Sequence, residues 1–189
     1  MKRIVILASG RGTNFEAIVR YIREHELPIE VVALITDNPK AGAIERAKRL
    51  GVPVKVIDYK KIGDKKLYNE LLKQAIDEAE PDLVVLAGYM RILPPEIVRP
   101  YFGRIVNIHP ARLPAFPGLN AIERAFKHGV KVTGVTVHFV DEGVDTGPII
   151  AQECVKIEPG DTLETLEEKI HRVEHELYPR VIRELLLGS

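Results

Sequence analysis

Short apolar runs alternate with amphipathic stretches through the first hundred residues, and this alternation restricts the fold more than any other feature of the sequence. It predicts strands over 3–8, 31–36, 54–57 and 83–87, and helices over 14–24, 41–50 and 65–79. Strand-helix-strand units connect by right-handed crossovers, which produce a parallel sheet covered on both faces. We therefore expect an α/β fold of Rossmann-like type, with a mostly parallel twisted sheet flanked by helices.

The second half departs from this alternation. A further strand is predicted at 104–107, and the prolines and glycine of 108–118 exclude a regular element there, which places His109 on a rigid loop. Residues 131–140 and 148–157 read as a C-terminal antiparallel hairpin. A long amphipathic terminal helix is predicted over 162–187, capped by Asp161 or Thr162, and Pro179 is where a bend would fall.

Length and charge narrow the class of protein. The chain has 189 residues with 27 Lys+Arg and 27 Asp+Glu, so one domain with an ordinary core is the default expectation. Zero net charge argues against nucleic acid as a partner, because such binding depends on many Lys and Arg contacts. There is neither an apolar run of about 20 residues nor a signal-peptide pattern, so we expect no membrane association and a cytoplasmic protein.

Ligands of such sheets bind beyond the carboxyl ends of the strands. The segments to consider are therefore 9–14, 36–38, 87–93 and 107–110. In the first, Gly10 and Gly12 form a Gly-x-Gly turn that opens a helix, an arrangement whose backbone amides cradle a phosphate. Phe15 occupies the third glycine position of the dinucleotide fingerprint, so one phosphate is favoured over NAD. A purely structural tight turn is the alternative.

Six histidines are present, and His109 is the best candidate for chemistry. Asn107 and Asp145 complete an amide donor, an imidazole and a carboxylate, the groups that acyl transfer to an amine requires. His138 falls in a predicted strand and reads as a buried sheet residue. His171 and His175 lie four residues apart on the last helix, a spacing that could bind a metal. Because no third ligand follows at a known spacing, this is weak evidence for a metal site.

Six motifs together resemble one enzyme family over nearly the whole chain. They are NIHP at 107–110, LPxFPG at 113–118, VHFV at 137–140, DxGP at 145–148, SGxGTN at 9–14 and LAGYMRIL at 86–93. The chain is similar in these motifs to the phosphoribosylglycinamide formyltransferases, the folate-dependent enzymes of purine synthesis. The resemblance implies one formyltransferase domain over 1–189, with a nucleotide and phosphate half at 1–100 and a catalytic and folate half at 101–189.

The resemblance also implies the reaction and its residues. The formyl group of 10-formyltetrahydrofolate would pass to the primary amine of N1-(5-phosphoribosyl)glycinamide, with no metal. Asn107 and protonated His109 would stabilise the oxyanion, and Asp145 would assist proton transfer. The ribonucleotide site would comprise Gly12, Thr13, Asn14 and Glu174. The folate site would comprise Lys65, Met90, Arg91, Ile92, Leu93, Asn107, Val140, Asp141, Glu142 and Gly143.

Two related classes and two other functions are weighed against this one. Methionyl-tRNA formyltransferases carry an additional C-terminal domain, and formyltetrahydrofolate deformylases an N-terminal regulatory domain, neither of which we expect here. A hydrolase with water as acceptor and a degenerate binding module stay alternatives. We expect small molecules as the only binding partners, and we expect the protein to be a monomer or a homodimer. The chain departs from the family pattern at Lys65, Ala111, Arg112, Asn120 and His171. Of these, Arg112 beside the catalytic loop lacks an explanation.

Overall fold

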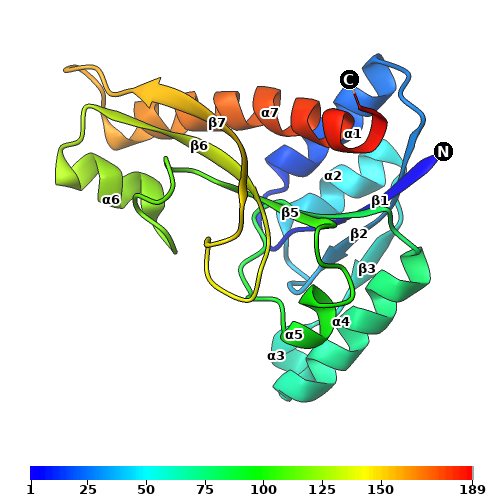
Figure 1. Cartoon of the computed structure of the whole chain (residues 1–189). Coiled ribbons are helices and arrows are strands. Elements are labelled where there is room, and N and C mark those ends of the chain that lie inside the picture. The colour runs from blue at the N-terminus through cyan, green and yellow to red at the C-terminus, as the bar shows by residue number, and fades with distance from the viewer. Residues whose placement is uncertain (189) are drawn as a thin grey trace. The chain divides into compact units, whose positions relative to one another are not determined.

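Seven strands form one mostly parallel sheet, as the alternation predicts (Figure 1). The structure is a computed structural model that describes residues 1–188. The strand order is β3-β2-β1-β4-β5-β6-β7; β1 pairs in parallel with β2 and β4, β2 in parallel with β3, and β6 antiparallel with β7. The strands are β1 (Lys2–Leu7), β2 (Ile29–Thr36), β3 (Val54–Val56), β4 (Leu83–Leu86), β5 (Ile105–His109), β6 (Val132–Phe139) and β7 (Ile149–Lys156).

The chain divides into two compact units, Met1–Val106 and the part from Asn107 on, and the division falls within β5. In the first unit, β1 and β4 are buried along most of their length because helices cover the sheet on both faces. Figure 1 shows α1 and α2 on one side of these strands and α4 on the other. The helices of this unit are α1 (Thr13–Glu24), α2 (Gly42–Leu50), α3 (Tyr59–Ile62), α4 (Lys65–Ala79) and α5 (Pro95–Val98).

The second unit is built on the β6–β7 ribbon. It has two helices, α6 (Ala121–His128) and α7 (Leu163–Leu187), and α7 packs against both strands. Thr162 caps α7 by accepting a hydrogen bond from the Thr165 amide, one of the two predicted caps. The helix runs without interruption through the buried Pro179.

Sequence periodicity missed two helices and misplaced the end of β5. Helices α3 and α5 have four residues each, too few for an apolar period to show. Helix α6 ends at His128, which was expected near a helix end. His109 was expected on a loop, but it is the last residue of β5. Its main chain still belongs to the strand because the first residue that cannot donate to a sheet is Pro110. Within residues 1–188, no helix has the length and apolar character needed to cross a membrane.

Candidate active site

Asn107 and His109 stand at the carboxyl end of β5, as predicted. Because the two residues are two positions apart in a strand, both side chains lie on the same face of it. His109 is buried, and its Nε2 donates to the main-chain oxygen of Phe116 at 2.7 Å. Its Nδ1 faces Asp145 Oδ2 at 3.4 Å. The structure therefore brings the predicted histidine and carboxylate together although they are far apart in the sequence.

His138 on β6 belongs to the same cluster, which the sequence did not reveal. It is buried, as its strand position predicts, and its Nδ1 donates to the Phe139 carbonyl at 2.8 Å. Its Nε2 lies 3.5 Å from Asp145 Oδ1 and 3.4 Å from Asn107 Nδ2. Strand alternation predicts that His138 is buried, but it does not predict which side chain His138 faces. The one sequence signal for a role in the site was its position in the VHFV motif.

Both imidazoles are fixed in the same manner. Each donates one N–H to a main-chain oxygen, so the nitrogen that faces Asp145 carries a proton only when that ring is cationic. Burial raises the pKa of Asp145, but the hydrogen bond from His138, the Gly118 amide and the charges of both histidines outweigh it, so the pKa lies below its usual value. The cluster therefore holds an ionised carboxylate between two histidines.

The loop between β6 and β7 sets the position of Asp145. Asp141 Oδ1 accepts hydrogen bonds from the Gly143 amide at 2.9 Å and from Thr146 Oγ1 at 2.7 Å. The main chain passes so close to β6 at Gly147 that a Cβ there would lie 1.8 Å from the Phe139 oxygen. Asp145 itself has a left-handed φ of 55°. The loop is thus held by several hydrogen bonds, and the amide of Gly143, a residue expected in the folate site, already has an acceptor.

A buried polar group holds the segment that follows His109. Thr136 Oγ1 donates to the Ala111 oxygen at 2.7 Å and accepts from the Leu113 amide at 3.1 Å. Gln152 Nε2 donates to the Leu113 oxygen at 2.8 Å and to Thr136 Oγ1 at 3.0 Å. Arg112 is exposed, and a Cβ at Gly134 would lie 2.7 Å from its Cγ. The arginine stem therefore lies over a residue without a side chain, which leaves room for it, and the exposed position keeps the charge in solvent.

In the first unit, the Gly-x-Gly turn opens α1 as predicted. Gly12 is the N-cap residue with a φ of 77°, and no side chain caps the helix. The first amides of a helix have no partner inside it, so those of Thr13 and Asn14 are available to an anion. The buried Oδ1 of Asn14 also has no hydrogen-bond partner. The uncapped amides agree with a phosphate site, whereas the Asn14 oxygen is an acceptor and adds nothing to that argument.

Three of the predicted strand-end segments are in contact within the first unit. The Met90 amide donates to Ser9 Oγ at 2.9 Å, and Arg91 Nε donates to the buried Asp37 Oδ2 at 2.8 Å. The Arg91 guanidinium lies 3.3 Å from the centre of the Tyr59 ring, a cation–π contact. Met90 and Ile92 are 63% and 66% exposed, whereas Leu93 is buried. Met90 therefore does not fill the core, which leaves two apolar side chains open to a ligand.

The remaining predicted residues lie on helices. Lys65 is the first residue of α4 and is exposed. Glu174 on α7 is buried, and its Oε1 is 2.7 Å from His171 Nδ1. Among residues 1–188 no cluster of three or more metal-ligating side chains is found.

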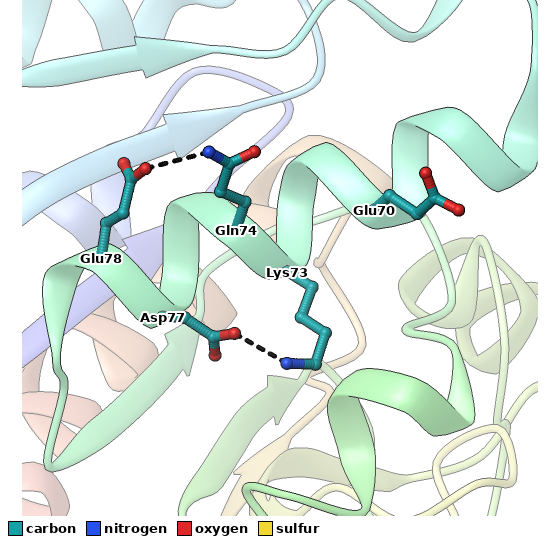
Figure 2. Close-up of a pocket in the computed structure, with 5 residues that line it drawn as sticks. All are labelled: Glu70, Lys73, Gln74, Asp77 and Glu78. Carbon is teal, nitrogen blue, oxygen red and sulfur yellow. Dashed lines mark hydrogen bonds and ion pairs between the residues drawn. The ribbon is translucent and has the colours of Figure 1, made fainter.

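A hollow of about 450 Å³ lies on the outer face of α4 (Figure 2). Two i,i+4 contacts cross it, Lys73 Nζ to Asp77 Oδ2 at 2.7 Å and Gln74 Nε2 to Glu78 Oε1 at 3.2 Å. Such pairs are typical of a solvated helix face. None of the predicted site residues lines this hollow.

A histidine, an amide and a carboxylate at a strand end of a Rossmann-like sheet define an α/β enzyme with groups suited to acyl transfer. The chain belongs to the formyl transferase family, which it matches over residues 2–182. It is 46% identical to a phosphoribosylglycinamide formyltransferase of Bacillus subtilis (strain 168), over 98% of this chain and 95% of that protein.

Longer relatives and solved structures agree with this assignment. The chain is 41% identical over its whole length to part of the Drosophila melanogaster trifunctional purine biosynthetic protein adenosine-3, of which it spans 14%. The crystal structure of phosphoribosylglycinamide formyltransferase from Bacillus halodurans is 55% identical, with a TM-score of 0.94 over 98% of this chain and 96% of that one. A glycinamide ribonucleotide transformylase 1 from Geobacillus kaustophilus is 51% identical with a TM-score of 0.94, over 98% and 99% of the two chains.

Proposed function

We propose that the protein transfers the formyl group of 10-formyltetrahydrofolate to the primary amine of N1-(5-phosphoribosyl)glycinamide, in the synthesis of IMP. The amine nitrogen forms a bond to the formyl carbon, the bond from that carbon to N10 breaks, and one proton passes from the amine to N10. The observation that carries the proposal is the placement of His109 between a main-chain oxygen and an ionised Asp145. Family membership supports the folate-derived donor.

Asn107 and His109 supply the donors for the oxyanion in this proposal. In the free protein, the Phe116 oxygen lies 2.7 Å from His109 Nε2, the distance that an oxyanion donor requires. The formyl oxygen would replace this carbonyl as the acceptor, and Asn107 Nδ2 would be the second donor. Asp145 faces the imidazole and receives a proton of the attacking amine, which it returns to the leaving nitrogen.

Binding roles are proposed for each unit in turn. In the first, the amides of Gly12, Thr13 and Asn14 would hold the phosphate, and Met90 to Leu93 with Lys65 would contact the folate. In the second, Val140 to Gly143 and Asn107 would contact the folate, and the buried Glu174 would accept hydrogen bonds from the ribose. These roles are supported by the uncapped start of α1, by the exposed Met90 and Ile92, and by the carboxylate of Glu174.

The test is an assay for loss of 10-formyltetrahydrofolate with and without the ribonucleotide, in EDTA. We expect turnover that requires the amine and does not require a metal. Asn107→Ala, His109→Ala and Asp145→Ala should each reduce kcat by about 10²-fold or more while the protein stays folded. His25→Ala, which changes an exposed histidine on the first unit, is the control. Formate release without the amine would indicate a deformylase, and a fully active His109→Ala variant would refute the assignment.

A further inference from the structure

We propose that Arg46 is a positioning residue for the phosphate-binding turn, acting through the Arg11 carbonyl and Glu16. The inference rests on the proposed function, which places the ribonucleotide phosphate at the amides of residues 12–14. Arg46 lies on α2, outside the motifs that the sequence analysis singled out. It does not contact the phosphate in this proposal; it fixes the main chain that does.

The Arg46 side chain makes two hydrogen bonds in two directions. Nε donates to the main-chain oxygen of Arg11, inside the turn, at 2.7 Å, and Nη1 donates to Glu16 Oε1, in the first turn of α1, at 2.9 Å. The guanidinium is planar and rigid, so it holds the turn and the helix at a fixed separation. A lysine at this position has one nitrogen and cannot reproduce this fork.

The main chain of α2 holds the same turn from one side. The Ala43 amide donates to the Gly10 oxygen at 3.0 Å, and a Cβ on Gly12 would lie 2.5 Å from the Ala43 Cβ. In a trans peptide the C=O and the following N–H point in opposite directions. Because the Arg11 oxygen points toward Arg46, the Gly12 N–H is turned away from Arg46 and is free to face an anion.

The charges around Glu16 favour an anion at this end of α1. Arg20, Arg46 and Arg49 approach the Glu16 carboxylate at 2.7, 2.9 and 3.5 Å. The Arg20 hydrogen bond lowers the pKa of Glu16, burial opposes this, and Arg46 lowers it again, so the carboxylate stays ionised. One negative charge thus faces three positive charges, and the excess adds to the positive end of the helix.

The experiment compares Arg46→Gln with Arg49→Gln in the full chain. Both variants remove one positive charge beside Glu16, but only the first removes the bond to the Arg11 carbonyl. For Arg46→Gln we expect the KM for the ribonucleotide, and the inhibition constant of inorganic phosphate, to rise about tenfold, the usual effect of losing a charged hydrogen bond. The KM for 10-formyltetrahydrofolate and kcat should stay within about twofold.

Arg49→Gln should raise the same two constants less than about threefold, because it changes only an exposed charge. Equal effects in the two variants would overturn the positioning role, as would a ribonucleotide KM unchanged in Arg46→Gln. Arg46→Lys keeps the charge and should fall between Arg46→Gln and the native protein; it also serves as the test if Arg46→Gln does not fold. A native protein without ribonucleotide-dependent turnover would instead refute the proposed function.

Discussion

Asp145 lies between two histidines, and each presents to it the ring nitrogen that does not donate to a main-chain oxygen. The carboxylate and the two rings therefore form one cluster, in which replacing one side chain changes the surroundings of the other two. His109 carries the proposed donor to the oxyanion, and His138 contacts both Asp145 and Asn107. The second histidine is thus linked to the first through the carboxylate that both rings face.

This arrangement predicts a shift in the pH dependence of His138→Leu. The variant loses the hydrogen bond and the charge that lower the pKa of Asp145, so burial raises that pKa toward or above the usual value of about 3.9. Activity requires the ionised carboxylate, so the acid limb of kcat/KM should move to higher pH. His138→Gln, which keeps an N–H donor, should move it less. An acid limb at the same pH in all three proteins would contradict the role of His138.

At the scale of elements, the β6–β7 loop holds its active residue by close main-chain contact. Gly147→Ala places a Cβ against the main-chain oxygen of Phe139. That oxygen cannot move away without disrupting the pairing of β6 with β7. We expect a loss of about 1–3 kcal/mol in the free energy of unfolding and a fall in kcat as Asp145 moves. Gly160→Ala is the control, because nothing lies within 4 Å of its Cβ position. Urea unfolding and steady-state kinetics measure both effects, and equal stability of the two variants would refute the argument.

Elements and site residues differ in how far the sequence predicts them. Alternation located the strands and long helices because burial on one face repeats along the chain, and it located Asn107 and His109 because ligands gather at strand ends. Four-residue helices leave no such period, so α3 and α5 were missed. The roles of His138 and Arg46 depend on what each side chain meets across the fold, on Asp145 and on the Arg11 carbonyl. Such pairings have no local sequence signal.

At the scale of the whole molecule, equal numbers of acidic and basic residues leave no net charge. The carboxylates with lowered pKa values have hydrogen-bond or charge partners close by. Carboxylates with a pKa below the usual value occur in four places: helix α1, helix α4, the β6–β7 loop and the turn before α7. These are Glu16, Asp77, Asp141, Asp145 and Asp161, the last with a pKa of about 2. Cytoplasmic location and a monomeric or homodimeric state stay predictions.

These carboxylates predict how stability depends on pH. Each has a lower pKa in the folded than in the unfolded protein, so the unfolded state binds more protons in the range between the two values. The contribution of these carboxylates to the free energy of unfolding should therefore be constant above about pH 5 and fall as the pH decreases to about 2, since unfolded Asp and Glu titrate near 3.9 and 4.3. Urea unfolding at a series of pH values measures this.

Asp141→Asn isolates one contribution to that slope. The asparagine oxygen can still accept from the Gly143 amide and Thr146 Oγ1, the two bonds that order the loop, but it does not titrate. Stability near pH 2, where Asp141 is protonated, should therefore change little, whereas stability at pH 7 should fall, so the decline toward pH 2 becomes shallower. The Thr146 hydrogen bond is the main cause of the lowered pKa of Asp141, so Thr146→Val should flatten the decline as well, with a loss at neutral pH. A slope that neither variant alters would show that Asp141 does not contribute to acid unfolding.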